Sequence, residues 1–510
     1  IPLSNIISAS SFIISLTAIF FFIKSTFFSP IGNQFDLLIF LGFSFLIQLA
    51  YLDKKSFFSK IIFAAILAGL AISLKPLLAS DFPYLPPYRY FWKSAANIFN
   101  NPVNALFGIG VDNYSSIFTK VKDGFYNQSK FWQINSFNVS RSTLLHVLTE
   151  SGLAGFLGLI LLLLYSFSKS IKSNKKFILL IIYFTCLILF FPPSLPLFFI
   201  MYIILLGGAS GRDHASAQRF FQPVAGREHL REGNSLQNLT KSRREIDLKE
   251  KPLFYFIPLA LFIFIAITAY FLARSYLAEY YFKKSLDGLA NKNIKIAYDN
   301  QRLAILTNRY IERYRIAFSQ TNLLIANSTA QKASQQLNNQ QLAINNKSSD
   351  VLSPQDRQTI SQAIQAAIEE GKAAVSLNSE KAGNWENLGD IYSNLVNTAE
   401  GANQWAISSY QRAITLDPQN VKYRIILGGV YYLQGNYTEA GRYFEQAIAL
   451  KPDWPNAHYN LAWALYQKKD YQRAISEMQT VINLLAPLKE SADLEKAKKD
   501  LTEFRLKLLQ

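Results

Sequence analysis

The sequence predicts an all-α protein in two parts, a multi-spanning transmembrane helical bundle followed by a soluble α-solenoid of short helical repeats. Three observations lead to this fold class. Long apolar runs lie almost entirely before Arg274, the last third of the chain is polar, and a pattern of small and aromatic residues recurs there in three copies, two of which align at a period of 34 residues. Runs such as Leu153–Phe167 carry no charge and no polar face, which disfavours two soluble domains.

Seven apolar segments are expected to cross the membrane, at residues 5–24, 36–52, 59–79, 143–168, 177–192, 194–208 and 253–273. They divide the first half into membrane helices at 1–79, an outer loop at 80–142, membrane helices at 143–208, a cytoplasmic loop at 209–252 and a last membrane helix at 253–273. Because the chain begins with Ile1 and not with Met, we expect further helices of the bundle to precede it.

Basic residues set the expected orientation of these segments. They cluster in three connections, as Lys54, Lys55 and Lys60; as Lys169, Lys172, Lys175 and Lys176; and as Arg243, Arg244, Lys249 and Lys251. If all seven segments cross, the three clusters lie on one side, which should be the cytoplasm. The sequence therefore predicts a multi-pass protein of the cytoplasmic (inner) membrane, with loop 80–142 and everything after residue 273 extracytoplasmic.

Composition limits the chemistry. The net charge of +17 comes without a recognisable nucleic-acid-binding module, so we expect membrane lipid or a diphosphate, and not nucleic acid, as the anionic partner. A single cysteine, Cys186, excludes a disulfide within the chain. With only four histidines besides, we expect neither a metal site nor a cofactor.

The outer loop is basic on the side where positive charge is usually depleted. It carries Arg89, Lys93, Lys120, Lys122, Lys130 and Arg141 against three aspartates. One interpretation is that these side chains only reach lipid headgroups. The other is a pocket for the diphosphate of a membrane-borne substrate, because the planar guanidinium binds phosphate oxygens in pairs.

The order of residues in and after this loop is specific. It comprises Arg89, Trp92, Asn101-Pro102, Gly108-Ile109-Gly110 and Asn113, then Leu145, Glu150, Gly152 and Gly155. This pattern resembles the O-antigen ligase and polymerase family of membrane glycosyltransferases over about residues 87–162. The resemblance implies a bundle of the GT-C-like type. It also implies transfer of a glycan from a polyprenyl diphosphate carrier to a glycan, lipid or protein acceptor at the outer face, in cell-surface polysaccharide or glycoconjugate assembly.

The resemblance also implies the site residues. Arg89, Arg141 and His146 are the candidate catalytic residues, and Arg89, Trp92, Lys93, Asn113 and Arg141 are the candidates for substrate binding. The sequence departs from the family at Arg141-Ser142, where the family has His-Asn. Three interpretations stay open: Arg141 is a second phosphate ligand, His146 is the base, or the site is degenerate.

The polar third of the chain repeats. One copy contains Leu427, Gly428, Tyr431, Tyr437, Ala440, Phe444, Ala447 and Pro452. The next copy repeats the pattern 34 residues later with Leu461, Ala462, Leu465, Tyr471 and Ala474. The preceding copy, with Leu388, Gly389, Tyr392, Tyr410, Ala413 and Pro418, matches after an insertion of about five residues near Asn397–Asn403. The pattern resembles the tetratricopeptide repeat, a pair of antiparallel helices that binds protein partners. We expect such repeats at 382–490, degenerate copies at 274–381 and a capping helix at 491–510.

Two functions remain after this reading. The first is a ligase-like glycosyltransferase that uses a lipid-linked glycan donor and recruits a protein partner through the repeats. The alternative is a non-catalytic membrane-anchored repeat scaffold for a surface-assembly complex, which the missing His-Asn pair favours. A transporter is disfavoured because no charged residues lie in the middle of the expected spans.

Overall fold

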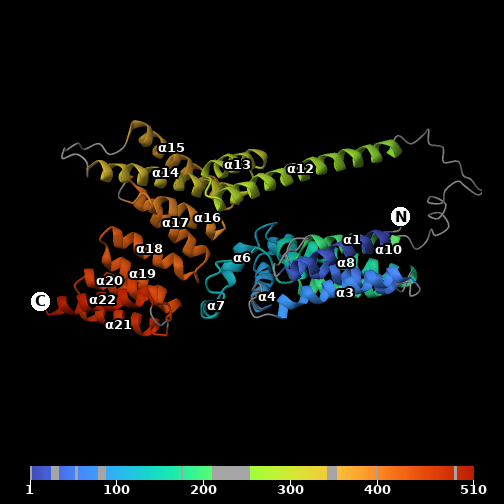
Figure 1. Cartoon of the computed structure of the whole chain (residues 1–510), viewed down its shortest axis with the longest axis horizontal. Coiled ribbons are helices and arrows are strands. Elements are labelled where there is room, and N and C mark those ends of the chain that lie inside the picture. Colours follow the sequence, from blue (N-terminus) through green and yellow to red (C-terminus); the bar gives the residue numbers. More distant parts are fainter. Residues whose placement is uncertain are drawn as a thin grey trace, which may run out of the picture. The chain divides into compact units, whose positions relative to one another are not determined.

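A computed structural model describes residues 3–24, 34–51, 56–78, 88–173, 176–209, 253–341, 353–396, 399–487 and 491–509. Throughout these ranges the regular secondary structure is helical, as the sequence predicts (Figure 1). The chain divides into two compact units, Ile1–Ala225 and Gly226–Gln510. The cytoplasmic loop expected at 209–252 lies almost wholly outside the described residues, as do Lys54, Lys55 and Lys175.

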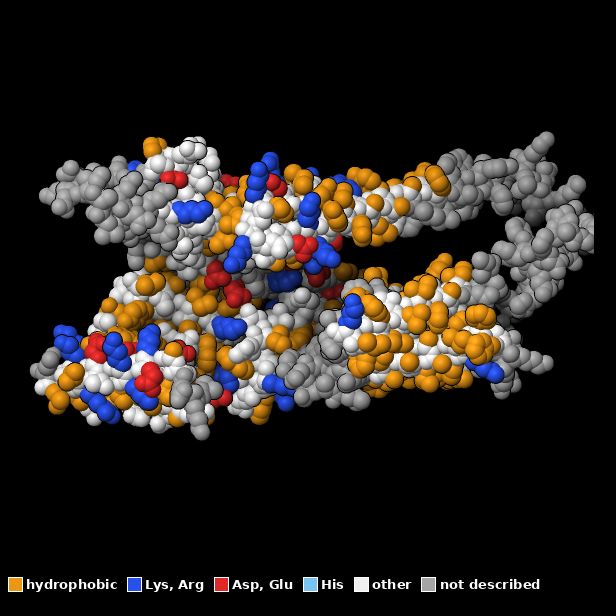
Figure 2. Space-filling view, viewed as in Figure 1, with side chains coloured by type: hydrophobic (Ala, Val, Ile, Leu, Met, Phe, Trp, Pro, Cys, Tyr) orange, Lys and Arg blue, Asp and Glu red, His pale blue; other side chains and the backbone are white. Residues whose placement is uncertain are grey.

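Six apolar helices form the frame of the first unit. They are α1 (Leu3–Ile23), α2 (Gln34–Tyr51), α3 (Phe57–Leu78), α8 (Thr143–Ser173), α9 (Lys176–Phe190) and α10 (Leu195–Ala209). Within the described residues, three stretches are long and apolar enough to cross a membrane: Ile6–Ile23, Phe57–Leu74 and Thr143–Ser168. The apolar stretches of α2, α9 and α10 are shorter. Hydrophobic side chains cover the visible face of this frame (Figure 2).

Short helices fill the loop that precedes α8, which the sequence places on the outer side. They are α4 (Tyr88–Asn97), the 3₁₀ turn Ile98–Asn100, α5 (Pro102–Phe107), α6 (Tyr114–Val121) and α7 (Gly124–Gln128). Their aromatic side chains bury one another, with Phe91, Tyr114, Phe118 and Tyr126 almost inaccessible to solvent. Leu145 and Leu148 of α8 join the same cluster. The loop is therefore a packed helical layer on the first turns of α8.

The second unit is a series of helix pairs. It comprises α12 (Leu253–Ala290), α13 (Ile294–Thr307), α14 (Glu312–Gln341), α15 (Pro354–Leu377), α16 (Ala382–Ser393), α17 (Ala402–Leu416), α18 (Val421–Leu433), α19 (Tyr437–Leu450), α20 (Pro455–Gln467), α21 (Tyr471–Leu485) and α22 (Ala492–Leu508). Each helix packs against the next along the chain, which is the architecture of a solenoid. Asparagine, aspartate or serine side chains cap the starts of α18, α19, α21 and α22.

One helix is longer than the sequence predicts. The last membrane segment was expected to end at residue 273, but α12 continues without interruption to Ala290. No glycine occurs in this helix before Gly288, and its one proline lies near its start at Pro258, so nothing stops the helix at the end of the apolar run.

Candidate functional site

The candidate site lies on α4, α6 and the first turns of α8. Arg89 and Lys93 are one turn apart on α4 and therefore share a face. Both side chains donate to the same carboxylate oxygen, Oδ2 of Asp123, at 2.5 and 2.6 Å. The Tyr90 hydroxyl donates to Oδ1 of Asp123 at 3.1 Å. One carboxylate thus orients two cations, and the group keeps a net positive charge.

The cluster formed by Arg89, Tyr90, Lys93 and Asp123 lies at the protein surface. The side chains of Arg89 and Lys93 are 46% and 48% exposed. Desolvation raises the pKa of Asp123, but the hydrogen bonds from Lys93, Arg89 and Tyr90 outweigh it and hold that pKa below its ordinary value. Asp123 is therefore ionised at neutral pH. The Arg89 guanidinium also lies 5.3 Å from the centre of the Phe125 ring.

Arg141 meets the same end of α4. Its guanidinium lies over the Tyr88 ring, 4.7 Å from the ring centre, and Tyr88 immediately precedes Arg89. The Tyr88 hydroxyl donates to the carbonyl of Phe190, at the end of α9, over 3.2 Å. The buried Nε of Arg141 has no hydrogen-bond partner among the residues that the structure describes. Arg141 thus has one buried donor without a partner beside the first turn of α4.

His146 and Glu150 form a pair one turn apart on α8. Nε2 of His146 lies 3.4 Å from Oε2 of Glu150, and the two side chains are 14% and 9% exposed. Nδ1 of His146 accepts the backbone N–H of Ser140 at the long distance of 3.5 Å. The other carboxylate oxygen of Glu150 accepts the N–H of Tyr114, the first residue of α6, at 3.3 Å. Glu150 therefore links the histidine to the aromatic layer.

The two glycine motifs of the sequence pattern form one contact. Ile109 and Gly110 donate their backbone N–H groups to the carbonyls of Thr149 and Glu150, at 3.1 and 3.0 Å. A Cβ on Gly108 would lie 2.2 Å from the backbone of Glu150, and one on Gly152 would lie 2.4 Å from the nitrogen of Gly108. Both glycines have positive φ, 76° and 62°. Only glycine fits at these two positions.

The remaining residues of the pattern have structural or surface positions. The Asn101 side chain caps α5 by accepting the N–H of Val103 at 2.9 Å, and Pro102 starts that helix. The Asn113 amide donates to the carbonyl of Ile109 at 3.0 Å, so it supports the Gly-x-Gly turn. Trp92 is 62% exposed and projects from the layer.

The structure brings the predicted site residues together only in part. Arg89 and Lys93 share Asp123, Arg141 contacts the neighbouring Tyr88, and His146 pairs with Glu150 on α8. Within the described residues, no hydrogen bond joins His146 to either arginine. Sequence reasoning missed Asp123 and Tyr88 as partners, since neither belongs to the family pattern.

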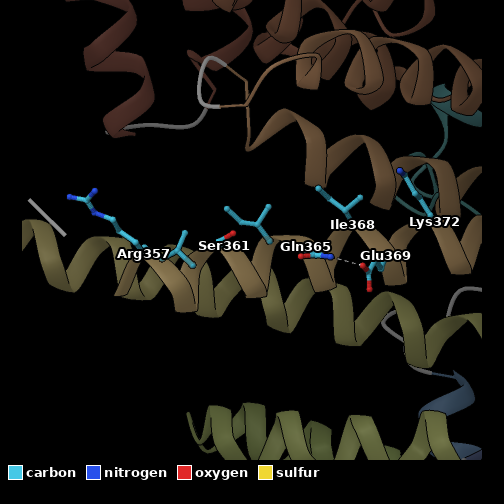
Figure 3. A pocket seen from close by; sticks show the side chains of 8 residues that line it. Arg357, Ser361, Gln365, Ile368, Glu369 and Lys372 are labelled. Carbon is cyan, nitrogen blue, oxygen red and sulfur yellow. Dashed lines mark hydrogen bonds between the residues drawn. The ribbon is translucent and has the colours of Figure 1, made fainter. Parts of the chain in front are cut away.

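The repeat unit contains cavities of its own. One of about 590 Å³ runs along α15 and is lined by side chains from Arg357 to Lys372 (Figure 3). The Gln365 amide donates to Glu369 at 3.0 Å on this face. A second cavity, of about 540 Å³, lies among α18, α19 and α20, with Gly429 and Trp463 in its wall.

Among the described residues, no cluster of three or more His, Cys, Asp or Glu side chains could hold a metal ion. What the site can do follows from its charges. Its cations are Arg89 and Lys93, which are half-exposed around Asp123, and Arg141, which lies over Tyr88; a histidine–carboxylate pair lies on α8.

Comparisons with known proteins concern the repeats. Two tetratricopeptide-repeat family models match residues 399–455 and 431–486. A mouse (Mus musculus) protein, protein O-mannosyl-transferase TMTC1, is 40% identical over 57 residues, which are 11% of this chain and 6% of the mouse protein. The match therefore leaves most of that protein unrepresented.

Solved repeat proteins are similar at low sequence identity. A thermophilic tetratricopeptide-repeat protein of Thermus thermophilus is 18% identical, with 46% of this chain and 100% of that chain covered and a TM-score of 0.30. MamA of Desulfovibrio magneticus is 12% identical, with 42% and 98% covered and a TM-score of 0.32. Tetratricopeptide repeats are modules for protein interaction. The C-terminal region of this chain, including residues 399–486, consists of tetratricopeptide repeats.

Proposed function

We propose that this protein is a membrane-bound, O-antigen ligase-like glycosyltransferase, which moves a glycan from a polyprenyl diphosphate to an acceptor hydroxyl at the outer face of the cytoplasmic membrane. One observation carries the proposal. Arg141 lies over the ring of Tyr88, the residue that precedes Arg89 on the first turn of α4, and it precedes the start of α8, whose apolar stretch is long enough to cross a membrane. A diphosphate carried by a membrane lipid would arrive at that level.

The two arginines would bind the diphosphate. The Nε of Arg141, which is buried and has no hydrogen-bond partner among the described residues, would donate to a phosphate oxygen when substrate binding exposes it. Arg89 now contacts Asp123, but Lys93 contacts the same oxygen and would keep that carboxylate neutralised when Arg89 turns to the substrate. Fixed cations of this kind stabilise the charge that a departing diphosphate develops.

The reaction would be a single displacement in its simplest form. The acceptor oxygen attacks the anomeric carbon, and the bond from that carbon to the diphosphate oxygen breaks. The electron pair leaves with the polyprenyl diphosphate, towards Arg89 and Arg141. The hydroxyl proton passes to Nδ1 of His146, whose long contact with Ser140 gives way, while Glu150 faces Nε2 and stabilises the imidazolium.

The test is glycan transfer in membranes of a host that lacks its own ligase. We expect Arg89→Ala and Arg141→Ala each to lower transfer by at least about a hundredfold, the usual effect of removing one group that stabilises transition-state charge. Lys130→Ala, which removes an exposed cation from the same layer, should leave transfer unchanged. Full activity of both arginine variants at equal protein level would exclude this site.

The alternative, a non-catalytic scaffold, is favoured by the Arg141-Ser142 departure and by the repeats. The matched mouse protein is named an O-mannosyl-transferase, but the match covers 6% of it and does not carry that activity across. The same host separates the two functions. A scaffold would support surface assembly equally well with Arg89→Ala, and would lose that support when the repeats are deleted.

A further inference from the structure

The structure of α12 relates the repeats to the membrane. Residues 253–273 of this helix carry no charge, and Arg274 is its first charged residue. At 1.5 Å per residue, these 21 residues extend about 31 Å, the thickness of the hydrocarbon core of a bilayer. Figure 2 shows hydrophobic side chains along the part of this run that it draws in colour. The helix then continues to Ala290 within the repeat unit.

Arg274, the residue that follows the uncharged run, binds the C-terminal end of α13. Its Nη2 donates to the carbonyl of Thr307 at 2.5 Å and lies 3.4 Å from the carbonyl of Leu306. These carbonyls terminate α13, where the helix dipole places partial negative charge. Because α13 runs back along α12, the turn from α13 to α14, residues 306–311, lies beside the position where the uncharged run ends.

This turn exposes apolar and aromatic side chains. Leu306 is 66% exposed and Tyr310 is 74% exposed. On α12, Tyr270 and Tyr276 are 57% and 77% exposed. Tyrosine side chains at the end of an apolar helix are typical of the membrane–water interface, where the ring is buried and the hydroxyl is hydrated.

The charge around the turn is positive. Arg309 is exposed at its tip, and Arg274 is bound to carbonyl groups that do not neutralise it. The nearby carboxylates are already paired, since Glu279 contacts Arg313 and Glu312 contacts Lys381. Such a surface attracts the anionic headgroups of a bilayer.

We propose that the α13–α14 turn, with Tyr270 and Tyr276 of α12, inserts into the headgroup layer of an anionic bilayer and seats the repeat unit on the membrane. This inference rests on the proposed membrane insertion of α12 but not on glycan transfer. The α12–α13 hairpin is thereby held at a fixed distance from the lipid, because α12 is one unbroken helix.

The test uses the full chain with Cys186→Ser, reconstituted in phosphatidylglycerol-containing nanodiscs. Single cysteines at Tyr310 and at Asn291 carry a bimane fluorophore, and nitroxide lipids labelled near the headgroup act as quenchers. Asn291 is the matched control, because it is exposed in the turn at the opposite end of α13. That helix has 14 residues, so the control lies about 20 Å from the lipid surface.

We expect quenching at Tyr310→Cys to exceed that at Asn291→Cys at least threefold. Equal quenching at the two sites would overturn the inference. Protection of the Tyr310 label from both nitroxide lipid and aqueous iodide would also overturn it, because a protein surface would then cover the turn.

A third label separates this inference from its premise. Phe262→Cys lies in the uncharged half of α12, where the native side chain is 69% exposed. Quenching of this site by nitroxide placed deep in the acyl chain, without quenching at Tyr310, would refute the seating of the repeats alone. No quenching at Phe262 would refute the insertion of α12 and the inference with it. Neither result depends on transfer activity.

Discussion

At the scale of single residues, Gly108 and Gly152 fix the layer of short helices onto α8. Each backbone occupies a conformation that is open in practice only to glycine, with φ and ψ of 76° and −171° at Gly108 and 62° and −162° at Gly152. The kink at Gly152 also separates the turns that carry His146 and Glu150 from the uninterrupted apolar part of α8. The geometry of the candidate site therefore depends on a contact between two backbones.

Two glycines of α8 should respond differently to the same substitution. Gly152→Ala places a Cβ 2.4 Å from the nitrogen of Gly108 and forces an unfavourable φ, so we expect a loss of about 3 kcal/mol or more. Gly158→Ala is the control, because a Cβ there meets nothing within 4 Å. Heating the purified protein in detergent and measuring the fraction that stays monodisperse compares the two. Equal midpoint temperatures for Gly152→Ala and Gly158→Ala would contradict the close contact between Gly152 and Gly108.

Sequence alone could identify the arginines but not their partners. Arg89 and the glycines are found because they follow a family pattern, and the resemblance places Arg141 at the position of the family's His-Asn pair. Asp123 follows Arg89 by 34 positions and belongs to no motif, so its contact exists only once α4 and α7 have packed. The pairing of His146 with Glu150 was available from their i, i+4 spacing, whereas the contact of Glu150 with Tyr114 was not.

At the scale of elements, the repeat helices were predictable and the short helices of the outer loop were not. Helices α17 and α19 end at Leu416 and Leu450, two residues before Pro418 and Pro452 of the repeat pattern, because proline and the residue before it do not continue a helix. Helix α5 has six residues and α7 has five, which is too few for a helical period of apolar residues to be recognised in the sequence. Aromatic burial holds them, and that depends on residues distant in sequence.

Neighbouring glycines in α18 allow a test of repeat packing. A Cβ on Gly428 would meet the Phe444 ring at 2.5 Å, whereas one on Gly429 would meet nothing within 4 Å. We expect Gly428→Ala to cost about 1–3 kcal/mol through overpacking. Gly429→Ala should stabilise α18 by up to about 1 kcal/mol, because alanine is the better helix former.

Thermal unfolding followed by tryptophan fluorescence measures both variants, since Trp454 and Trp463 lie in the adjoining repeat. The opposite signs matter more than the magnitudes. If both substitutions lowered the midpoint equally, the contact of α18 with Phe444 would not be the one that limits the size of residue 428.

At the scale of the whole molecule, composition predicts an apolar part up to residue 273 and a repeat part after it. The structure has two compact units, Ile1–Ala225 and Gly226–Gln510, so the apolar start of α12 belongs to the second unit. The number of membrane crossings does not follow in the same way. Three described stretches are long enough to span, while the apolar stretches of α2, α9 and α10 are shorter. An apolar run of 10–14 residues fits a buried helix as well as a membrane segment. The orientation therefore rests on the basic clusters.

That orientation leads to a prediction about which side of the membrane each unit faces. In the Cys186→Ser background, Asn291→Cys at the tip of the α12–α13 hairpin should react with a membrane-impermeant maleimide in intact spheroplasts. Ser56→Cys, in the connection between α2 and α3 and one turn before Lys60 of α3, should react only after the membrane is permeabilised. Gel-shift of the labelled protein reads both sites in one experiment.

The pattern of labelling distinguishes the ways in which the prediction can be wrong. Reaction of both sites in intact spheroplasts would place residues 56 and 291 on the same side, so that an odd number of the expected crossings between them is absent. Because α9 and α10 are short and meet at Pro192-Pro193, a hairpin that enters and leaves from one side would remove two crossings and preserve the prediction. The comparison of the two sites does not depend on whether α2 crosses the membrane, because α2 precedes both of them. A single missing crossing after Ser56 would instead put the repeats in the cytoplasm, away from any acceptor at the outer face, and would contradict the proposed function together with the topology.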